Sequence, residues 1–465
     1  MFNLGTGNMI RNDTIIAPAT AQGMAAIAVI RISGRNALLL LEGRFYSRKG
    51  TLRHSQDFKP NTVYFGILKD GSQVLDEVVV TFFRAPHSYT GEDTIEISCH
   101  GSVFIQKKVL ELFIAAGARY ADPGEFTMRA FLQGKLDLSQ AEAVADLISS
   151  ESAAAHQLAI NQLRGGYSQT ISALRDRLVE FAALLELELD FSEEDVEFAD
   201  RERFSALLSQ IQMHMYSLLD GFQSGNAIKK GIPIAIAGKP NAGKSTLLNT
   251  LLNEERAIVS DIAGTTRDTI EDNLVLDGIA FRLIDTAGIR PSEDVIEQIG
   301  ISRAKSAVAN ATVLLYVFDA SETRLEEVEQ ELGALKIADK TRIIIVANKC
   351  DVTDVKFQEV PFGKELVRIS AKQGDGIELL KTLLVKPYRL LLQNDVLVTN
   401  VRHADAINNS LKSVERLQLA LKANVSGDLL AFEVREAISL LGIITGEVHN
   451  DELLGHIFSK FCIGK

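Results

Sequence analysis

The chain has 465 residues, more than one hydrophobic core usually contains, so we expect two or three domains. Its composition, 46% hydrophobic and 24% charged, is that of an ordinary globular protein, and no run approaches the roughly 18 consecutive apolar residues that span a bilayer. The formal net charge of -12 excludes a strong overall positive field, so any contact with RNA must be local or shared with a partner.

The three cysteines, Cys99, Cys350 and Cys462, are an odd number, lie far apart and form no CxxC pair. We therefore predict reduced thiols and neither a zinc site nor a redox couple. The segment from Met1 to Ile10 lacks the cationic and apolar regions of a secretory signal. These features predict a cytoplasmic protein with no membrane association.

Strand and helix patterns are mixed from about Thr14 to Gly117. Runs rich in apolar and β-branched residues predict strands at 26–33, 74–83 and 93–98, with Gly, Pro and Asp between them. A helical pattern follows over 106–117. We expect this part to form an α/β domain of its own.

Long helical periodicity replaces the strand signals from about Pro123 to Ser224, for example over 138–163 and 171–191. After Ile232, strand and helix patterns alternate as in a doubly wound fold. The predicted strands of this block are 232–238, 281–288, 313–320, 342–351 and 366–371.

Helical patterns return after about Val385, over 389–423 and 429–445, and they resemble the segment before the block. The economical interpretation is one helical domain divided by an inserted α/β domain. Proteins tolerate such insertions when the ends of the insert lie close together.

A phosphate-binding loop follows the first strand of the block. Gly238 to Ser245 reads GKPNAGKS, which matches GxxxxGK[ST] between an apolar strand and a helical segment. Backbone N–H groups of such a loop point at phosphate oxygens, Lys244 reaches the β- and γ-phosphates, and the Ser245 hydroxyl can bind Mg²⁺. The nucleotide-binding residues predicted here are Asn241, Ala242, Gly243, Lys244, Ser245 and Thr246.

Two later strings predict which base is bound. Asn348, Lys349, Cys350 and Asp351 spell NKCD at the end of a predicted strand. A carboxylate only accepts hydrogen bonds, so Asp351 can pair with the adjacent N1 and N2 donors of guanine but not with adenine. The segment expected to back the base is Ser370, Ala371 and Lys372. The predicted substrate is therefore GTP and not ATP.

Two further strings complete a GTPase site. DTAG at 285–288 supplies an acidic residue for the Mg²⁺ shell and a glycine that can sense the γ-phosphate. GTTRD at 264–268 contains Thr266, the predicted switch threonine that closes on Mg²⁺. The GTP-binding residues predicted in and before these strings are Ser260, Asp261, Ile262, Ala263, Gly264, Thr265, Thr266, Asp285, Thr286, Ala287 and Gly288.

Ile289 follows the DTAG glycine, where Ras-type enzymes have a glutamine that positions the attacking water. An apolar side chain cannot orient water, so either hydrolysis is very slow or another polar group takes this role. Arg290 is one candidate, as an internal arginine finger, and a solvated surface arginine is the alternative.

Four strings point to one protein family: GKPNAGKS, DTAGI, DIAGTTRD at 261–268 and FCIGK at 461–465. With them, the sequence resembles the MnmE (also called TrmE) family of tRNA modification GTPases over essentially its whole length. HSYTGEDTIEISCHGS at 87–102 and ADPGEFTMRAFLQGKLDLSQAEAVADLI at 121–148 are similar to the folate-domain strings of the family.

The resemblance implies a multidomain fold, α/β plus all-α. The predicted parts are an N-terminal α/β folate-binding and dimerisation domain at 1–130, a discontinuous helical domain at 131–228 and 388–465, and an inserted Ras-like P-loop GTPase domain at 229–387.

The resemblance also implies potassium-dependent hydrolysis, with two G domains meeting face to face. Potassium places positive charge where an arginine finger would sit. The implied K⁺ ligands are the Asn241 side chain and oxygens of Ser260, Ile262 and Thr265, and the Mg²⁺ ligands are Ser245 and Thr266. The catalytic candidates are Glu297, which would position the water, Asp268 and Cys462.

The first domain of the family binds a reduced folate, 5,10-methylenetetrahydrofolate or 5-formyltetrahydrofolate, and forms a homodimer. The folate-binding residues implied are Arg31, Glu92, Lys135 and Lys465. Glu92 suits the amidine edge of a pterin, and the cationic side chains suit the carboxylates of a glutamate tail. Cys462 could be either a buried hydrophobe or a nucleophile near the folate.

The implied activity is GTP hydrolysis coupled to installing a (carboxymethyl)aminomethyl-type group at C5 of the wobble uridine of certain tRNAs. The implied partners are GTP, tRNA, a second copy of the chain and a flavin-binding protein resembling MnmG, in a heterotetramer. The alternative is a ribosome-assembly GTPase that acts as an RNA-binding switch. It gives no reason for FCIGK or the folate strings, and the sequence has no basic RNA-binding appendage.

Overall fold

The computed structural model describes residues 13–190, 201–254, 273–284, 307–335, 337–353, 365–393, 397–423 and 425–465. The chain divides into two compact units. Unit 1 consists of Met1–Ile148, Gln162–Leu208 and Asn409–Lys465, and unit 2 of Ser149–Asn161 and Ser209–Asn408. None of the described helices combines the length and the apolar character that a bilayer crossing requires.

Unit 1 begins with a seven-stranded sheet in the order β3-β4-β5-β6-β2-β1-β7. Its strands are β1 (Ile15–Pro18), β2 (Ile27–Ser33), β3 (Phe45–Ser47), β4 (Thr62–Asp70), β5 (Gln73–Phe83), β6 (Thr94–His100) and β7 (Arg119–Tyr120). β7 runs parallel to β1, and the other neighbouring strands are antiparallel. Two short 3-10 helices, η1 (Leu39–Leu41) and η2 (Ser55–Asp57), lie between strands.

The core of this domain forms where α1 (Val103–Ala115) covers one face of the sheet. Val109 and Phe113 of α1 are fully buried with Ile30 and Ile32 of β2. Because side chains alternate across a strand, Arg31 between these isoleucines lies on the opposite face. The predicted strands and helix are confirmed as β2, β5, β6 and α1, and the pattern did not reveal the four remaining strands.

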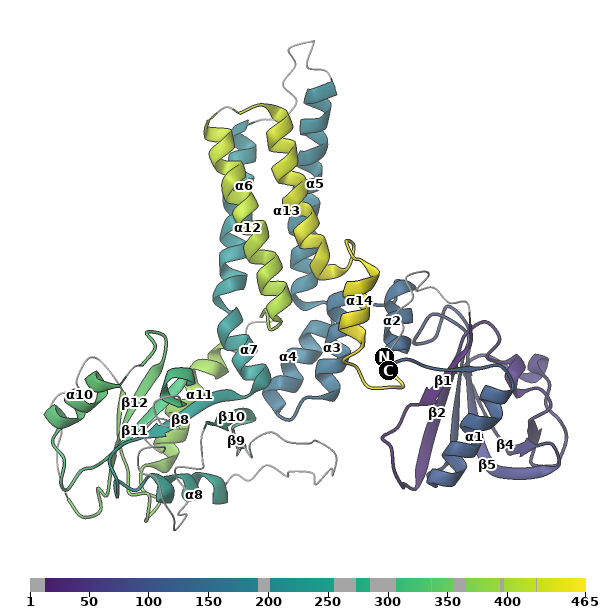
Figure 1. Ribbon diagram of the computed structural model, residues 1–465, viewed down its shortest axis with the longest axis horizontal. Helices are drawn as coiled ribbons and strands as arrows, with labels where there is room; N and C mark the ends of the chain where they lie inside the picture. The colour runs from purple at the N-terminus through teal and green to yellow at the C-terminus, as the bar shows by residue number, and fades with distance from the viewer. Residues whose placement is uncertain are drawn as a thin grey trace. The chain divides into compact units, whose positions relative to one another are not determined.

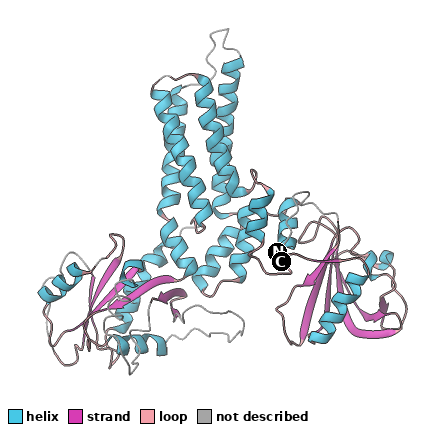
Figure 2. Ribbon diagram, in the orientation of Figure 1, coloured by secondary structure: helices cyan, strands magenta, loops and turns pink. Residues whose placement is uncertain are grey.

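Helices make up the rest of unit 1 (Figure 2). They are α2 (Glu125–Leu132), α3 (Leu138–Ile148), α5 (Gly166–Asp190), α13 (Gly427–Thr445) and α14 (Asp451–Phe458), with parts of α4 (Ala153–Leu163), α6 (Arg201–Asp220) and α12 (Val401–Lys422). Arg435 of α13 donates to Glu186 Oε1 of α5 at 2.7 Å, and Figure 1 shows the two helices side by side. The helices before and after the inserted block therefore form one discontinuous helical domain.

Two expected helical runs are interrupted, which corrects the prediction. The run over 138–163 is two helices, because the Ser152 hydroxyl accepts a hydrogen bond from Ala155 N at 3.2 Å and caps α4. The run over 389–423 is likewise broken: α11 (Ile377–Leu391) ends early in it, and Asn400 Oδ1 accepts from Arg402 N at 3.0 Å at the start of α12. Serine and asparagine compete with the helix for backbone hydrogen bonds, so they favour helix ends.

Unit 2 contains a six-stranded sheet in the order β13-β12-β11-β8-β10-β9. Its strands are β8 (Ile232–Ala237), β9 (Asn273–Leu276), β10 (Ile279–Leu283), β11 (Val313–Asp319), β12 (Arg342–Asn348) and β13 (Glu365–Arg368). Neighbouring strands are parallel except β9, which is antiparallel to β10. The helices of this unit include α7 (Phe222–Lys230), α8 (Lys244–Glu254), α10 (Leu325–Ala334) and α11 (Ile377–Leu391).

This sheet confirms the inserted doubly wound domain, with the five predicted strands observed as β8, β10, β11, β12 and β13. The predicted end of the second strand lies outside the described residues. β9 was not predicted, although Asp277 and Gly278, with φ of 50° and 77°, form a turn of the type that the pair Asp-Gly signals in hairpins.

Candidate functional site

The phosphate-binding loop joins the end of β8 to the start of α8, and two of its glycines are required by close contacts. Gly238 has φ of 140°, and a Cβ there would lie 1.9 Å from Val317 O. Gly243 has φ of 93°, and a Cβ would lie 2.1 Å from Asn348 Nδ2. Side chains at these positions would collide with the ends of β11 and β12, so the loop fits closely against the sheet.

Lys244 is the first residue of α8, and its side chain folds back onto the phosphate-binding loop. The Nζ donates to Gly238 O at 2.8 Å and to Lys239 O at 2.7 Å. Burial lowers the pKa of the Lys244 ammonium. Phosphate oxygens at the loop could take over these hydrogen bonds as stronger acceptors, which suits the predicted role. Ser245 and Thr246 follow in the first helical turn, and both are exposed.

Asn348 is buried and links the phosphate loop to the segment predicted to back the base. Its Nδ2 donates to Ala242 O at 2.8 Å, and its Oδ1 accepts from Ala371 N at 3.0 Å. Thr250 of α8 strengthens the same connection by donating to Ala371 O at 2.8 Å. The structure therefore gives Asn348 a scaffolding role that sequence reasoning did not assign.

Lys349 and Asp351 lie where β12 ends. Lys349 has φ of 63°, and its ammonium pairs with Asp319 at the end of β11. Burial opposes ionisation of Asp319, but hydrogen bonds from Lys349 and Ser321 outweigh it and hold the pKa of Asp319 below its ordinary value. The Asp351 side chain is exposed, so it is available to a ligand.

Ser370, Ala371 and Lys372 follow β13 at the same edge of the sheet. Ser370 and Ala371 are buried, while Lys372 is exposed. Ser370 N donates to Asp375 O at 2.9 Å, which closes the turn. The carboxyl ends of parallel strands thus bring the phosphate loop, NKCD and the Ser-Ala-Lys segment to one edge, where open α/β sheets bind ligands.

The remaining nucleotide and catalytic candidates lie outside the described residues, and their roles stay predictions. They are Ser260, Asp261, Ile262, Ala263, Gly264, Thr265, Thr266, Asp268, Asp285, Thr286, Ala287, Gly288, Arg290 and Glu297. Within the described ranges, no three His, Cys, Asp or Glu side chains gather in a way that could hold a metal. The oxygen donors that the described loop does offer, Asn241 and Ser245, suit hard cations such as K⁺ and Mg²⁺.

A second group of candidates gathers in unit 1, where the last residues of the chain lie against β1 and β2. Gly464 has φ of 94°, and a Cβ there would lie 1.9 Å from Pro18 O. Its carbonyl accepts from Arg31 Nη1 at 3.4 Å. Burial and the nearby Arg31 guanidinium lower the pKa of Lys465, while Glu96 and Cys462 act in the opposite direction. Arg31, Cys462 and Lys465 therefore lie close together.

Cys462 is exposed, so its thiol is accessible. The alternative that Cys462 is a buried hydrophobic residue is therefore wrong. Its carbonyl accepts from Gly124 N at 3.4 Å. Phe461 next to it is buried with Phe458 and Leu454 of α14. The tail is thus held by its backbone and by Phe461, not by the cysteine side chain.

Glu92 lies on the loop before β6, and its carboxylate is already bonded. Ser33 Oγ donates to Glu92 Oε2 at 2.9 Å, and Arg129 Nη1 donates to it at 3.2 Å. Lys135 is exposed and lies close to the neighbouring Gly91, where a Cβ would be 3.6 Å from Lys135 Cγ. Lys135 therefore lies near Glu92.

Sequence reasoning missed the residues that position these candidates. Glu96 accepts from Arg31 Nε at 3.0 Å and Nη2 at 2.8 Å, because β2 and β6 pair with Arg31 opposite Glu96. Arg129, almost fully buried, also donates to Glu125 at 2.9 Å. The alternation of polar and apolar residues in 93–98 could have placed Glu96 on the Arg31 face, but only the strand register makes them partners.

Comparison with known proteins agrees with this arrangement. A family model described as the MnmE helical domain matches residues 138–462, and one described as the GTP-binding protein TrmE N-terminus matches residues 14–135. The chain is 50% identical to the tRNA modification GTPase MnmE of Flavobacterium psychrophilum, covering 98% of this chain and 100% of that protein. It is 50% identical to the protein of that name from Cytophaga hutchinsonii, covering 97% and 98%, and 48% identical to that from Bacteroides thetaiotaomicron, covering 98% and 100%.

These matches favour a GTP hydrolase that acts in tRNA modification over the ribosome-assembly alternative, because they include the N-terminal domain and the helical domain on both sides of the inserted block. The chain therefore belongs to the MnmE (TrmE) family of tRNA modification GTPases.

Proposed function

We propose that this GTPase uses a reduced folate as the one-carbon donor for a (carboxymethyl)aminomethyl-type group at C5 of the wobble uridine. The observation that supports this most is the contact of the C-terminal tail with Arg31, on the face of the N-terminal sheet opposite α1. The exposed Cys462 thiol and the Arg31 guanidinium both lie close enough to Lys465 to shift its pKa. A folate bound there would supply the carbon unit.

The residues present fit a folate in charge and in shape. Arg31 carries its guanidinium 5.1 Å from the centre of the Tyr89 ring and 5.7 Å from that of Phe126. An aromatic wall and a fixed guanidinium suit the flat, partly anionic folate. The Glu92 carboxylate, held in place by Ser33 and Arg129, could accept the paired N–H donors of the pterin edge. Lys135 and Lys465 would serve the glutamate carboxylates.

Folate binding by the full chain tests this proposal directly. We expect 5-formyltetrahydrofolate to bind in a calorimetric titration, and Arg31→Ala to weaken binding by about tenfold or more, because charge-assisted hydrogen bonds are lost. Arg84→Ala is the matched control, since Arg84 also stacks on a ring of the same domain, that of Phe82, at 5.5 Å. No binding by the unaltered chain, or equal losses in both variants, would contradict the folate site.

We further propose that hydrolysis depends on K⁺ held by Asn241, Ser260, Ile262 and Thr265. Glu297 would position the attacking water, with Asp268 as a further catalytic group and Ser245 and Thr266 binding Mg²⁺. The apolar Ile289 after the DTAG glycine supports this, since a glutamine is missing there. The exposed Asn241, which has φ of 61°, presents a side-chain oxygen donor on the phosphate loop.

Replacing Na⁺ by K⁺ at equal ionic strength should raise GTP turnover by about tenfold or more, since fixed positive charge stabilises the transition state. Glu297→Ala should lower turnover by roughly 100-fold or more while GTP affinity stays nearly constant, as expected for a group that acts in the transition state. Glu322→Ala, at an exposed acid of the same domain, serves as the control. Equal turnover in both salts would rule out the potassium site.

We propose a homodimer formed by the N-terminal domain, with a flavin-binding partner resembling MnmG in a heterotetramer acting on tRNA in the cytoplasm. The proposed domain limits are 1–130, 131–228 with 388–465, and 229–387. An acidic chain needs local positive surface or such a partner to hold tRNA.

A further inference from the structure

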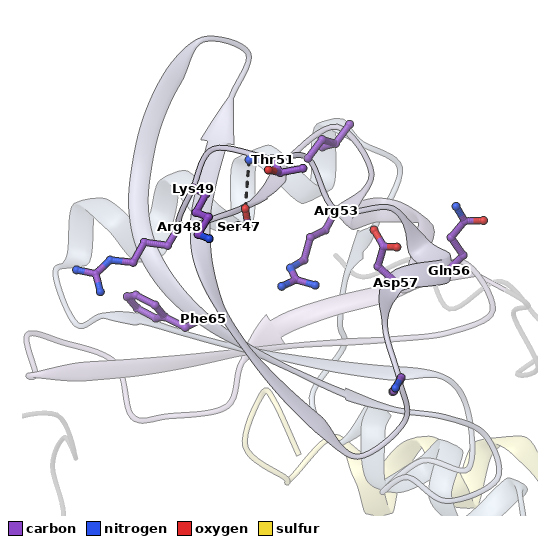
Figure 3. Close-up of a pocket in the computed structure, with 10 residues that line it drawn as sticks. Ser47, Arg48, Lys49, Thr51, Arg53, Gln56, Asp57 and Phe65 are labelled. Carbon is purple, nitrogen blue, oxygen red and sulfur yellow. Dashed lines mark hydrogen bonds between the residues drawn. The ribbon is translucent and has the colours of Figure 1, made fainter.

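A second polar site lies at the opposite side of the N-terminal sheet, around the edge strand β3. A hollow of about 800 Å³ opens between β3, the loop after it, η2 and β4. Six of its lining residues are Arg48, Lys49, Arg53, Gln56, Lys59 and Phe65. Figure 3 shows Arg53 in the middle, with Arg48 and Phe65 on one side and Asp57 and Gln56 on the other. We call this hollow the β3–β4 basic pocket.

Positive charge is concentrated around the β3–β4 basic pocket, although the whole chain carries -12. Between residues 43 and 69 the only acidic residue is Asp57. The basic residues of this stretch are Arg44, Arg48, Lys49, Arg53, Lys59 and Lys69. A local patch of this kind is what an acidic protein requires for contact with a polyanion.

The cationic side chains that line the pocket form no salt bridges within the described part of the chain. These side chains are Arg48, Lys49, Arg53 and Lys59, and none has a carboxylate oxygen within 4 Å. The Nε of Arg53 is buried and has no hydrogen-bond acceptor among the described residues. Asp57 also lines the pocket, and its Oδ2 accepts from His54 N at 2.8 Å, so four cations face this one lining carboxylate. The surplus of positive charge over the single lining carboxylate favours an anionic ligand.

Aromatic rings hold two of these arginines in place. The Arg48 guanidinium lies 5.7 Å from the centre of the Phe65 ring, and that of Arg53 lies 5.0 Å from the centre of Tyr64. Tyr64 in turn accepts from Lys59 N at 2.6 Å, which ties the loop to β4. A stacked guanidinium keeps its fork of donors free for a phosphate and loses little freedom on binding.

We propose that the β3–β4 basic pocket binds the phosphodiester backbone of the tRNA substrate. The pocket offers a small anion the same chemistry, but it lies at an open sheet edge where a long polymer can pass. The several unpaired cations match successive phosphates better than one small ligand. The chain acts on tRNA, and this is a place where its acidic surface gives way to positive charge.

Binding of unmodified tRNA to the full chain tests the proposal. Arg48→Ala with Arg53→Ala should weaken binding by about tenfold or more, because two bidentate contacts are lost. The slope of log affinity against log salt concentration should become shallower by roughly 1.5. Arg84→Ala, which removes one positive charge and one ring contact outside the pocket, should change neither quantity.

Two further variants keep the test valid if the double variant folds poorly. Lys49→Ala alters an exposed side chain, and it should reduce the salt slope by roughly 0.8 without changing the melting temperature. Arg48→Lys with Arg53→Lys should keep most of the slope but lose affinity, since lysine lacks the fork. Unchanged tRNA affinity and slope in all these variants overturn the proposal. Weaker binding of triglutamylated folate or inorganic phosphate, with tRNA binding intact, overturns it in favour of a small-anion site.

Discussion

Asp351→Asn should weaken GTP binding by roughly 100-fold or more, and xanthosine triphosphate should become the better ligand. The carboxylate accepts two N–H donors of guanine, and an asparagine side chain offers one acceptor and presents a donor where the second acceptor stood. Xanthine carries a carbonyl at C2, so the new amide donor finds an acceptor there. Each lost charge-assisted hydrogen bond contributes about 1.5 to 3 kcal/mol.

The position of Asp351 makes this result interpretable. Its side chain is exposed after the end of β12, so the fold does not depend on it. Asp339→Asn is the matched control, because Asp339 is an exposed aspartate just before the other end of the same strand. Competition of both nucleotides against a fluorescent GTP analogue would measure the change. Equal GTP affinity of Asp351→Asn and the unaltered chain would show that Asp351 does not read the base.

Cys462→Ser should abolish tRNA modification while GTP turnover and melting temperature stay close to those of the unaltered protein. Serine is nearly isosteric but lacks a thiolate at neutral pH. The thiol is exposed, and its neighbours hold the tail through Phe461, Gly464 and the Cys462 backbone, so little packing is lost. Deleting 462–465 should abolish modification too, because it also removes Lys465 and the carbonyl that Arg31 contacts.

Ile463→Ala separates chemistry from anchoring. Ile463 is 39% exposed, so its truncation perturbs the tail without touching the thiol. Modified tRNA would be measured by nucleoside mass spectrometry, with GTP turnover of the same samples as the internal reference. Normal modification by Cys462→Ser would remove the thiol from the mechanism. A parallel loss of modification and melting temperature in Cys462→Ser would assign the cysteine a packing role instead.

The nucleotide site could be predicted from sequence because its information is local. A phosphate loop needs its glycines and lysine within eight consecutive positions, and the strand before it and the helix after it are visible as patterns. The same holds for NKCD, which ends a strongly apolar strand. The sequence could not reveal that the Asn348 side chain forms hydrogen bonds with both Ala242 and Ala371. Those two bonds depend on how the ends of three strands meet in the folded sheet.

The tail site was harder to predict, because its residues come from opposite ends of the chain. Arg31 and Gly464 are brought together only by the finished fold, and no local pattern announces the contact. Resemblance supplied the candidates, whereas the partners that orient them, Glu96 and Arg129, depend on strand register and on burial of α2. Edge strands such as β3 were also missed, because three residues are too few to reveal the alternation of apolar and polar side chains that predicts a strand.

The interrupted layout of unit 1 has a consequence for how the chain is made. Unit 1 takes its last segment, Asn409–Lys465, from beyond the whole of unit 2. At the usual pace of translation, about 5 to 20 residues per second, the ribosome spends roughly 10 to 40 s between finishing Leu208 and reaching Asn409. During that time α5 cannot yet pack against α13, because α13 has not been synthesised. The nucleotide-binding domain, by contrast, can already fold. A nascent chain stopped before the final residues would therefore present a GTPase that lacks the tail contact with Arg31.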